Sequence, residues 1–333
     1  MADDVVWCSR HPRSIRDPQR APWCVALAAV LGFVAACSGP AATSSIATGD
    51  FLAEINGLTL WYRVAGRGPV CLMPTPAWGP SSDLYFRTLK PLEDYFTIVY
   101  LDSRGTGRSQ RAPSRTDYTW QQLVADLDAL RARLGQERIW LMGHSEGGAQ
   151  VLHYAVSHPT RVNGLVLLDS HAAGTEAEEA DAKARMERRS NAPWYSEAVR
   201  GLFAEPRSDV ELGRNLDAAL PLYWADPSRI RDHASHFAAT SMSAEAAQGL
   251  VASGRFPFDL RPRLGSINAP TLVVVGADDF ICSPAIAKDI HLGVRNSKLL
   301  LIEDSGHFPW LEQSQTFFRD VPRHLRALGL RTQ

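Results

Sequence analysis

One serine lies between two glycines at the point where a strand should give way to a helix. It is Ser145, in the stretch LMGHSEGGAQVLHYAVSHP, residues 141–159. A serine hydroxyl is a poor nucleophile until a base lies within hydrogen-bond reach. A strand–Gly-x-Ser-x-Gly–helix turn projects the hydroxyl from a strained backbone, while its glycines allow close strand–helix contact. We therefore predict that Ser145 is a nucleophile. The alternative is a glycine-rich turn whose serine only caps the helix.

The surrounding sequence predicts the elements that hold this turn. The apolar run RIWLMG (138–143) predicts the preceding strand, and GGAQVLHYAVSHP (147–159) predicts the following helix. Two strand-like runs flank Asn56-Gly57, which is a strong hairpin signal. Further buried strands are predicted at 68–74, 96–102, 162–170, 269–276 and 298–304, with helices at 119–135 and 310–328. A hairpin followed by strand–helix alternation predicts an α/β fold with a mostly parallel sheet and helices on both faces.

The alternation stops between the strands at 162–170 and 269–276. Residues 172–264 contain the polar helical run EAEEADAKARMERR and many aromatic residues, without a clear strand. This interruption predicts a helical lid inserted between two strands of the sheet.

With these elements around Ser145, the chain from about Phe51 to Leu330 resembles an α/β-hydrolase with a cap domain. The resemblance implies a mostly parallel eight-stranded sheet with helices on both faces. It also implies a core formed by residues 51–171 and 265–333, and a helical cap at 172–264. In that family the catalytic residues follow the order serine, acid, histidine.

This order requires the base to follow the cap, which leaves three histidines. His291 and His324 fall within predicted helices, whereas His307 follows the last strand in EDSGHFPW. The run GHFPWLEQ closely matches the family's histidine loop. We therefore expect His307 to be the base.

The acid is expected in the loop after the strand APTLVVVG. The family pattern Gly-x-x-Asp, counted from Gly276, gives Asp279, whose role would be to fix the tautomer of the histidine and stabilise the imidazolium. Asp278 is expected to be a solvated or capping neighbour. Asp169 is the alternative acid, because some members of the family place it after that earlier strand.

Two backbone N–H groups must stabilise the oxyanion that forms when Ser145 attacks. The resemblance assigns one to Glu146, the residue after the nucleophile. Many relatives carry His-Gly-x-Pro-Gly after the strand that ends near residue 74, but this chain has Thr75-Pro76-Ala77-Trp78-Gly79. Proline has no N–H, so the count assigns the second donor to Ala77, with Trp78 as the alternate.

Glu146 and Trp78 are also the predicted substrate-binding residues. A carboxylate beside an oxyanion site opposes anion stabilisation unless a positive charge offsets it, and the free α-amino group of a substrate could do so. The alternative is that the Glu146 side chain turns toward solvent or a backbone N–H.

The loop LDSRGTGRSQ (101–110) resembles the Asp-Gln-Arg-Gly-x-Gly-x-Ser loop of proline iminopeptidases, and GHFPWLEQ is most similar to the same branch. This resemblance favours an aminopeptidase-like serine hydrolase that acts through an acyl-enzyme on small peptide amides or esters. It implies no cofactor and no metal. A carboxylesterase of small acyl esters is the main alternative. A cofactor-free haloperoxidase-like enzyme and a non-catalytic ligand-binding lipoprotein also remain open.

Composition limits the partners. The net charge is −1 and no basic block occurs, which argues against nucleic acid and leaves a small molecule or short peptide as the expected substrate. Hydrophobic residues make up 45% of the chain, enough for a large core. Cys71 lies inside a predicted strand, so a disulfide with Cys282 is not expected.

The N-terminal segment resembles a bacterial lipoprotein signal. Four arginines precede an apolar stretch at 25–36 that ends in small residues and Cys37. The stretch is too short to span a bilayer, which takes about 20 residues. We therefore expect a signal peptide at 1–36, a lipid on Cys37 and a flexible tether at 37–50. The protein would then be exported and anchored to the outer side of a bacterial membrane, periplasmic or at the cell surface. A buried N-terminal helix is the alternative.

Overall fold

The computed structural model describes residues 46–330. The predicted signal peptide, Cys37 and residues 37–45 of the predicted tether lie outside these residues. The first strand begins at Gly49, so the last two residues assigned to the tether belong to the sheet. No helix within 46–330 combines the length and the apolar character needed to cross a membrane.

Eight strands form one sheet, which confirms the predicted fold class. β1 and β2 pair antiparallel, β2 and β4 also pair antiparallel, and every other neighbouring pair is parallel. In spatial order the strands are β1 (Gly49–Ile55), β2 (Leu58–Gly66), β4 (Thr97–Leu101), β3 (Val70–Pro74), β5 (Ile139–Ser145), β6 (Val162–Ser170), β9 (Thr271–Gly276) and β10 (Ser297–Ile302).

The hairpin at the start of the sheet forms because both of its turn residues can adopt a positive φ. Asn56 has a φ of 49° and Gly57 a φ of 80°. A two-residue turn with positive φ at both positions matches the twist of the flanking strands. The turn therefore sets the register of β1 against β2.

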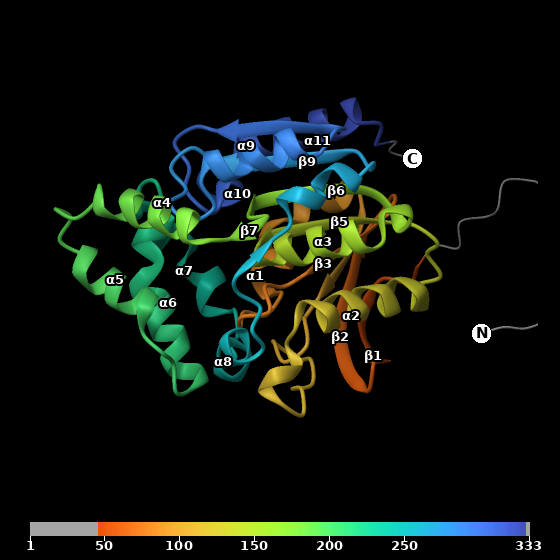
Figure 1. The fold of residues 1–333 in the computed structure, drawn as a ribbon, viewed down its shortest axis with the longest axis horizontal. Coiled ribbons are helices and arrows are strands. Elements are labelled where there is room, and N and C mark those ends of the chain that lie inside the picture. Colours follow the sequence, from red (N-terminus) through yellow and green to blue (C-terminus); the bar gives the residue numbers. More distant parts are fainter. Residues whose placement is uncertain (1–45, 331–333) are drawn as a thin grey trace, which may run out of the picture. The chain divides into compact units, whose positions relative to one another are not determined.

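Helices cover both faces of the sheet because successive strand residues point to opposite sides. The helices of the core are α1 (Asp83–Thr88), α2 (Trp120–Arg133), α3 (Glu146–Ser157), α9 (Pro284–Gly293), α10 (Pro309–Glu312) and α11 (Ser314–Ala327). In β3 (Val70–Pro74), Leu72 packs into the core beneath α2, α3 and α9, whereas Cys71 and Met73 pack into the core beneath α1 and α11 (Figure 1). Short 3-10 turns occur at Lys90–Asp94, Arg115–Asp117, Pro159–Arg161, Pro227–Arg229 and Arg261–Ser266.

An insert of helices lies between β6 and β9, in the region predicted as the cap. Figure 1 shows these helices, green to teal, gathered on one side of the sheet. They are α4 (Glu176–Glu187), α5 (Tyr195–Phe203), α6 (Asp209–Tyr223), α7 (Ile230–Ala238) and α8 (Ala244–Ala252). A short antiparallel pair, β7 (Ala173–Gly174) with β8 (Phe258–Asp259), joins the two ends of the insert where the chain leaves and re-enters the core.

The loop LDSRGTGRSQ is braced within the core. Arg104 donates to both carboxylate oxygens of Asp126 on α2, at 2.7 and 2.8 Å, and both side chains are buried. Asp102 accepts from the backbone N–H of Ser82 at 2.7 Å and of Arg108 at 2.8 Å. These contacts account for the charged residues of this loop as structural supports.

Candidate active site

Ser145 lies on a sharp turn between β5 and α3. Its φ is 56° and its ψ is −127°, a combination that costs a non-glycine residue about 1–3 kcal/mol. The turn closes tightly because Gly143 packs against the backbone of Gly147 and Gly148, where a Cβ would clash. The first turn of α3 also lies close to the end of β3, since a Cβ on Gly147 would come within 3.0 Å of the Pro74 carbonyl oxygen.

His307 and Asp279 are brought together by the loops that follow β10 and β9. The Nδ1 of His307 lies 2.7 Å from Oδ2 of Asp279, and both side chains are buried. The other oxygen of Asp279 accepts from the backbone N–H groups of Ile281 at 2.9 Å and Cys282 at 3.1 Å. Asp279 can therefore accept only from Nδ1–H, which leaves Nε2 of His307 as the proton acceptor.

The backbone of His307 is also fixed on both sides. Its N–H donates to the carbonyl of Tyr223 in the cap at 2.7 Å. Its carbonyl oxygen lies 2.9 Å from Nε2 of His144, whose Nδ1 lies 3.0 Å from the hydroxyl of Tyr85. Burial lowers the pKa of His144 well below its usual value, and the nearby His307 adds to this shift. His144 is therefore neutral, and donates through Nε2–H while Nδ1 accepts from the tyrosine.

Glu312 holds the histidine loop from its C-terminal side. Its carboxylate accepts from the backbone N–H of Gly306 at 2.8 Å and of Ala225, in the cap, at 2.8 Å. Burial raises the pKa of Glu312 to about 7, although these N–H groups oppose the shift. Nothing in the sequence analysis singled out Glu312, whose signal is only its place in GHFPWLEQ.

The other candidate acids and bases lie elsewhere. Asp169 accepts from the N–H of Gly276 at 2.8 Å and forms no bond to His307. Burial raises the pKa of Asp169 well above its usual value, and the charge of Asp279 adds to the shift. His291 contacts the hydroxyl of Ser297, and His324 contacts a carbonyl of its own helix.

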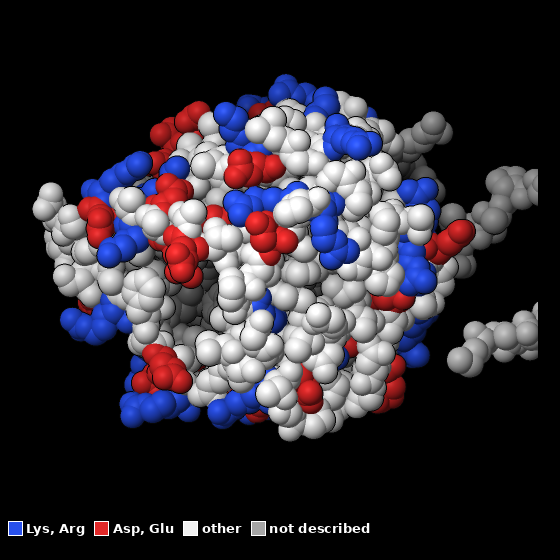
Figure 2. All heavy atoms as spheres, viewed as in Figure 1, with Lys and Arg blue, Asp and Glu red and all other residues white. Residues whose placement is uncertain are grey.

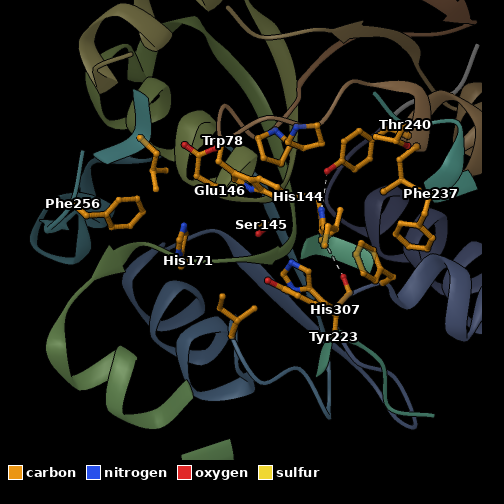
Figure 3. A pocket seen from close by; sticks show the side chains of 18 residues that line it. Trp78, His144, Ser145, Glu146, His171, Tyr223, Phe237, Thr240, Phe256 and His307 are labelled. Atoms are coloured by element: carbon orange, nitrogen blue, oxygen red, sulfur yellow. Dashed lines mark hydrogen bonds between the residues drawn. The ribbon is translucent and has the colours of Figure 1, made fainter. Parts of the chain in front are cut away.

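Ser145 and His307 line the same pocket (Figure 3). The hydroxyl of Ser145 forms no direct hydrogen bond to His307 within the described residues, and such bonds are often loose before substrate binds. The Cys282 thiol lies close to Ser145, Asp279 and His307. Burial raises its pKa well above the usual value, the charge of Asp279 adds to this, and a hydrogen bond with Ser145 opposes it.

One group of described residues has the composition of a metal site. Donor atoms of Asp279, Cys282 and His307 all lie within 4.8 Å of one another, and the three residues are buried. Two of these side chains are already bonded to each other, and a cation there would have to replace that bond.

The pocket around Ser145 is small and mostly apolar. Its volume is about 210 Å³, and in Figure 3 Ser145 lies at its centre, with His307 on one side and Trp78 and Glu146 on the other. The polar side chains of the wall belong to Tyr85, His144, Ser145, Glu146, His171, Tyr223, Thr240 and His307. The apolar wall consists of Pro76, Trp78, Pro80, Leu84, Leu216, Phe237, Leu250, Phe256, Ile281 and Phe308.

A second chamber adjoins the first beneath α4 and α5. Its volume is about 700 Å³, and it shares His171, Phe256 and Ile281 with the first pocket. Glu178, Glu179 and Glu187 line it together with Lys183. Figure 2 shows the surface hollowed beside the cap helices, with acidic and basic side chains interspersed around the hollow.

Comparison with known families identifies this arrangement. Residues 72–314 match the model of the alpha/beta hydrolase fold family. The chain belongs to the α/β-hydrolase family. This confirms the predicted superfamily and the prediction of a hydrolase.

Individual relatives within the α/β-hydrolase family are named for different activities. The chain is 30% identical to the proline iminopeptidase PfmaB of Pestalotiopsis fici, over 82% of this chain and 98% of that protein. It is 26% identical to a 2-hydroxy-6-oxononadienedioate/2-hydroxy-6-oxononatrienedioate hydrolase of Paraburkholderia xenovorans, over 85% of this chain and 97% of that protein. A solved α/β-fold hydrolase from Bacillus anthracis superposes with a TM-score of 0.70 at 16% identity, over 83% and 99% of the two chains.

The structure corrects the assignment of Ala77 as the second oxyanion donor of this α/β-hydrolase. The N–H of Ala77 donates to Oε2 of Glu146 at 2.5 Å, so it is not available to a substrate. Ala77 is fully buried, whereas Trp78 lines the pocket. No acceptor among the described residues bonds the N–H of Trp78, the alternate donor.

For Glu146 the structure favours the alternative hypothesis, because its side chain turns toward a backbone N–H, that of Ala77. The hypothesis that a substrate amine offsets its charge is not supported, because the carboxylate is already paired within the protein. Oε1 of Glu146 accepts from Nη1 of Arg255 at 2.5 Å, and the two side chains are 4% and 0% exposed. Burial raises the pKa of Glu146, and the charge of Arg255 opposes the shift. The protein therefore supplies its own counter-charge. Arg255 was missed because it lies 109 residues from Glu146, and no local pattern joins them.

Proposed function

We propose that this α/β-hydrolase cleaves small acyl compounds through an acyl-enzyme on Ser145, with His307 as the base and Asp279 as the acid that orients it. The observation that carries the proposal is the 2.7 Å contact of His307 with Asp279 in the pocket where Ser145 takes a positive φ. Ser145 Oγ would attack the carbonyl carbon as Nε2 of His307 takes its proton. The proton then passes to the leaving group as its bond breaks, and water releases the acyl group.

The substrate class we favour is an uncharged ester with a small apolar acyl group. Among the described residues that line the pocket of about 210 Å³, Glu146 is the only acid, and its carboxylate is occupied by Arg255 and Ala77. An ammonium group in that pocket would have no partner for its charge, which is costly. This supports the carboxylesterase alternative over the aminopeptidase.

An aminopeptidase of the proline iminopeptidase type is the second candidate. The 30% identity to PfmaB favours it, and so does the acidic lining of the adjoining chamber. Burial raises the pKa of Glu178 in that chamber to about 7, so a bound cation would draw this carboxyl into its charged form. A substrate amine that reached the chamber would find a partner there.

Two measurements test the proposal. A fluorophosphonate probe should label the wild-type protein and fail to label Ser145→Ala. An unlabelled wild type would support the alternative of a non-catalytic ligand-binding protein. Butyryl and prolyl p-nitroanilides then compare a neutral acyl group with an amine-bearing one on the same leaving group. We expect kcat/KM to favour the butyryl compound by about tenfold or more. A preference for the prolyl compound would instead support the aminopeptidase.

We also propose that the protein is exported and anchored to a membrane through a lipid on Cys37. The support is the sequence alone: four arginines, an apolar stretch at 25–36 and a small-residue run before Cys37. Metabolic labelling with palmitate in a bacterial host should mark the wild type and not Cys37→Ser. Equal labelling of both would remove the anchor from the proposal.

A further inference from the structure

A buried ion pair joins the end of the cap to the first residue of α3. Arg255 lies between α8 and β8, on the segment that returns from the cap to the sheet. Its backbone carbonyl accepts from the indole N–H of Trp120 at 2.8 Å, and its guanidinium lies 5.4 Å from the centre of that ring. Arg255 is therefore fixed by α2 as well as by its bond to Glu146. Figure 3 labels Glu146 on the pocket wall beside Ser145.

The ion pair bonds both the backbone N–H and the backbone C=O of Ala77, in the loop after β3. The N–H of Ala77 donates to Oε2 of Glu146, and Nη2 of Arg255 donates to the carbonyl oxygen of Ala77 at 3.2 Å. The two contacts use different nitrogens, Nη1 and Nη2, of one rigid planar guanidinium. A lysine would have to make both from a single nitrogen, without this fixed geometry.

These two bonds to Ala77 set the direction of the backbone N–H of Trp78. The bond between Ala77 and Trp78 is trans, since Phe256–Pro257 is the cis bond of the described chain. In a planar trans peptide the C=O and the N–H point in opposite directions. Because the Ala77 carbonyl points to the buried guanidinium, the Trp78 N–H points away from it, and Trp78 lines the pocket that contains Ser145.

We propose that Arg255 is a positioning residue, which acts with the side chain of Glu146 to aim the Trp78 N–H at the oxyanion that forms on Ser145. The first donor remains the backbone N–H of Glu146, which is the first residue of α3 and has no partner within its own helix. This inference rests on the proposed acyl-enzyme function and assigns the second donor of that site.

The charge of Arg255 is as necessary as its geometry. A lone carboxylate beside the oxyanion would oppose the developing negative charge. Loss of one partner of a buried ion pair leaves the other uncompensated. Removal of Arg255 should therefore destabilise the transition state in two ways, through a misdirected Trp78 N–H and through the uncompensated charge of Glu146.

The test compares Arg255→Met and Arg255→Lys with a matched control, Arg104→Met. Arg104 forms the other buried arginine–carboxylate pair described above, with Asp126, and does not line the pocket. Each variant is assayed on p-nitrophenyl butyrate and for inhibition by a small alkyl trifluoromethyl ketone, whose hemiketal oxygen occupies the oxyanion site. Folding is checked by circular dichroism and thermal melting.

For Arg255→Met we expect kcat to fall about 10²- to 10³-fold with a small change in KM, and the inhibition constant of the ketone to rise by a similar factor. Arg255→Lys keeps the charge but not the fork, so both values should fall between those of wild type and Arg255→Met. Arg104→Met should have a lower melting temperature than the wild type but, once folded, the same kcat and the same inhibition constant for the ketone.

The inference is overturned if a folded Arg255→Met or Arg255→Lys keeps wild-type kcat and ketone affinity. If Arg255→Met does not fold, the test relies on Arg255→Lys and on a third variant, Glu146→Gln. The third variant removes the charge of the carboxylate that bonds Arg255 and the Ala77 N–H. A wild-type protein that neither hydrolyses the ester nor binds the ketone would instead overturn the proposed function. The two failures are therefore distinguishable.

Discussion

His307 is held by contacts of different kinds. Asp279 binds the imidazole, Tyr223 binds the backbone N–H, and His144 binds the backbone carbonyl. Only the first contact controls the tautomer of the ring, since the other two position the backbone. The contact with Asp279 therefore has a chemical role that the others lack, and single substitutions should separate the two kinds of support.

Asp279→Asn should lower kcat by about 10⁴-fold, because an amide can donate to Nδ1 and so favour the wrong tautomer of His307. The matched control is Asp169→Asn. Burial raises the pKa of Asp169 well above its usual value and the charge of Asp279 adds to the shift, so a neutral amide is a mild change there that conserves the shape of the side chain and its bond to Gly276. We expect this control to retain kcat within about tenfold. Steady-state kinetics on p-nitrophenyl butyrate measures both, and similar losses in the two variants would contradict the assignment of the acid.

At the scale of elements, the turn between β5 and α3 depends on glycines, which have no side chain. Gly143 and Gly147 let the strand end approach the first helical turn, and Ser145 is the residue that projects from the contact. The sequence predicted this turn because all its requirements are local: an apolar strand, small residues at fixed spacing, and a helix that starts at once.

Gly143→Ala should destabilise the protein by about 1–3 kcal/mol and reduce kcat, since the new methyl group would meet the backbone of Gly147 and Gly148, which cannot move cheaply. Gly213→Ala on α6 is the matched control. Nothing lies within 4 Å of a Cβ at that position, so the added methyl should change stability by about 0–1 kcal/mol in the stabilising direction. Urea unfolding and the ester assay give both quantities. A Gly143→Ala protein as stable and active as the control would show that the turn tolerates a side chain.

The second oxyanion donor could not be predicted in the same way, because it depends on contacts between distant elements. Ala77 was chosen by counting along the loop, but its N–H is taken by a side chain 69 residues away. That side chain in turn depends on Arg255 in the cap, whose sequence surroundings, ASGRFPFD, show no signal of this role. The sheet and the order of Ser145, Asp279 and His307 follow from alternation and family order. The loop geometry follows from packing between parts of the chain that no local pattern connects.

For the whole molecule, acid sensitivity should arise where the cap end packs on the core. His153 on α3 stacks on Trp120 with ring centres 4.2 Å apart, and Phe258 of β8 lies 5.2 Å away. Burial lowers the pKa of His153 to about 4, and the charge of Arg263 and the nearby His171 add to the shift. Its ring Nε2 has no hydrogen-bond partner among the described residues. Protonation of this ring is therefore easier in the unfolded chain than in the native one.

The sign of the effect follows from this difference. Because the native pKa of His153 lies below the ordinary value of 6.5, its contribution to stability is complete above pH 6.5 and is lost as the pH falls toward 4. At pH 4.5 the loss should reach about 2 kcal/mol. In His153→Phe the ring has no proton to gain, so the free energy of unfolding in urea should fall less between pH 7.5 and 4.5. The variant at pH 7.5 is its own control, because any packing change from the larger ring appears there without the titration. Parallel pH profiles for the variant and the wild type would mean that acid acts on the molecule through other groups.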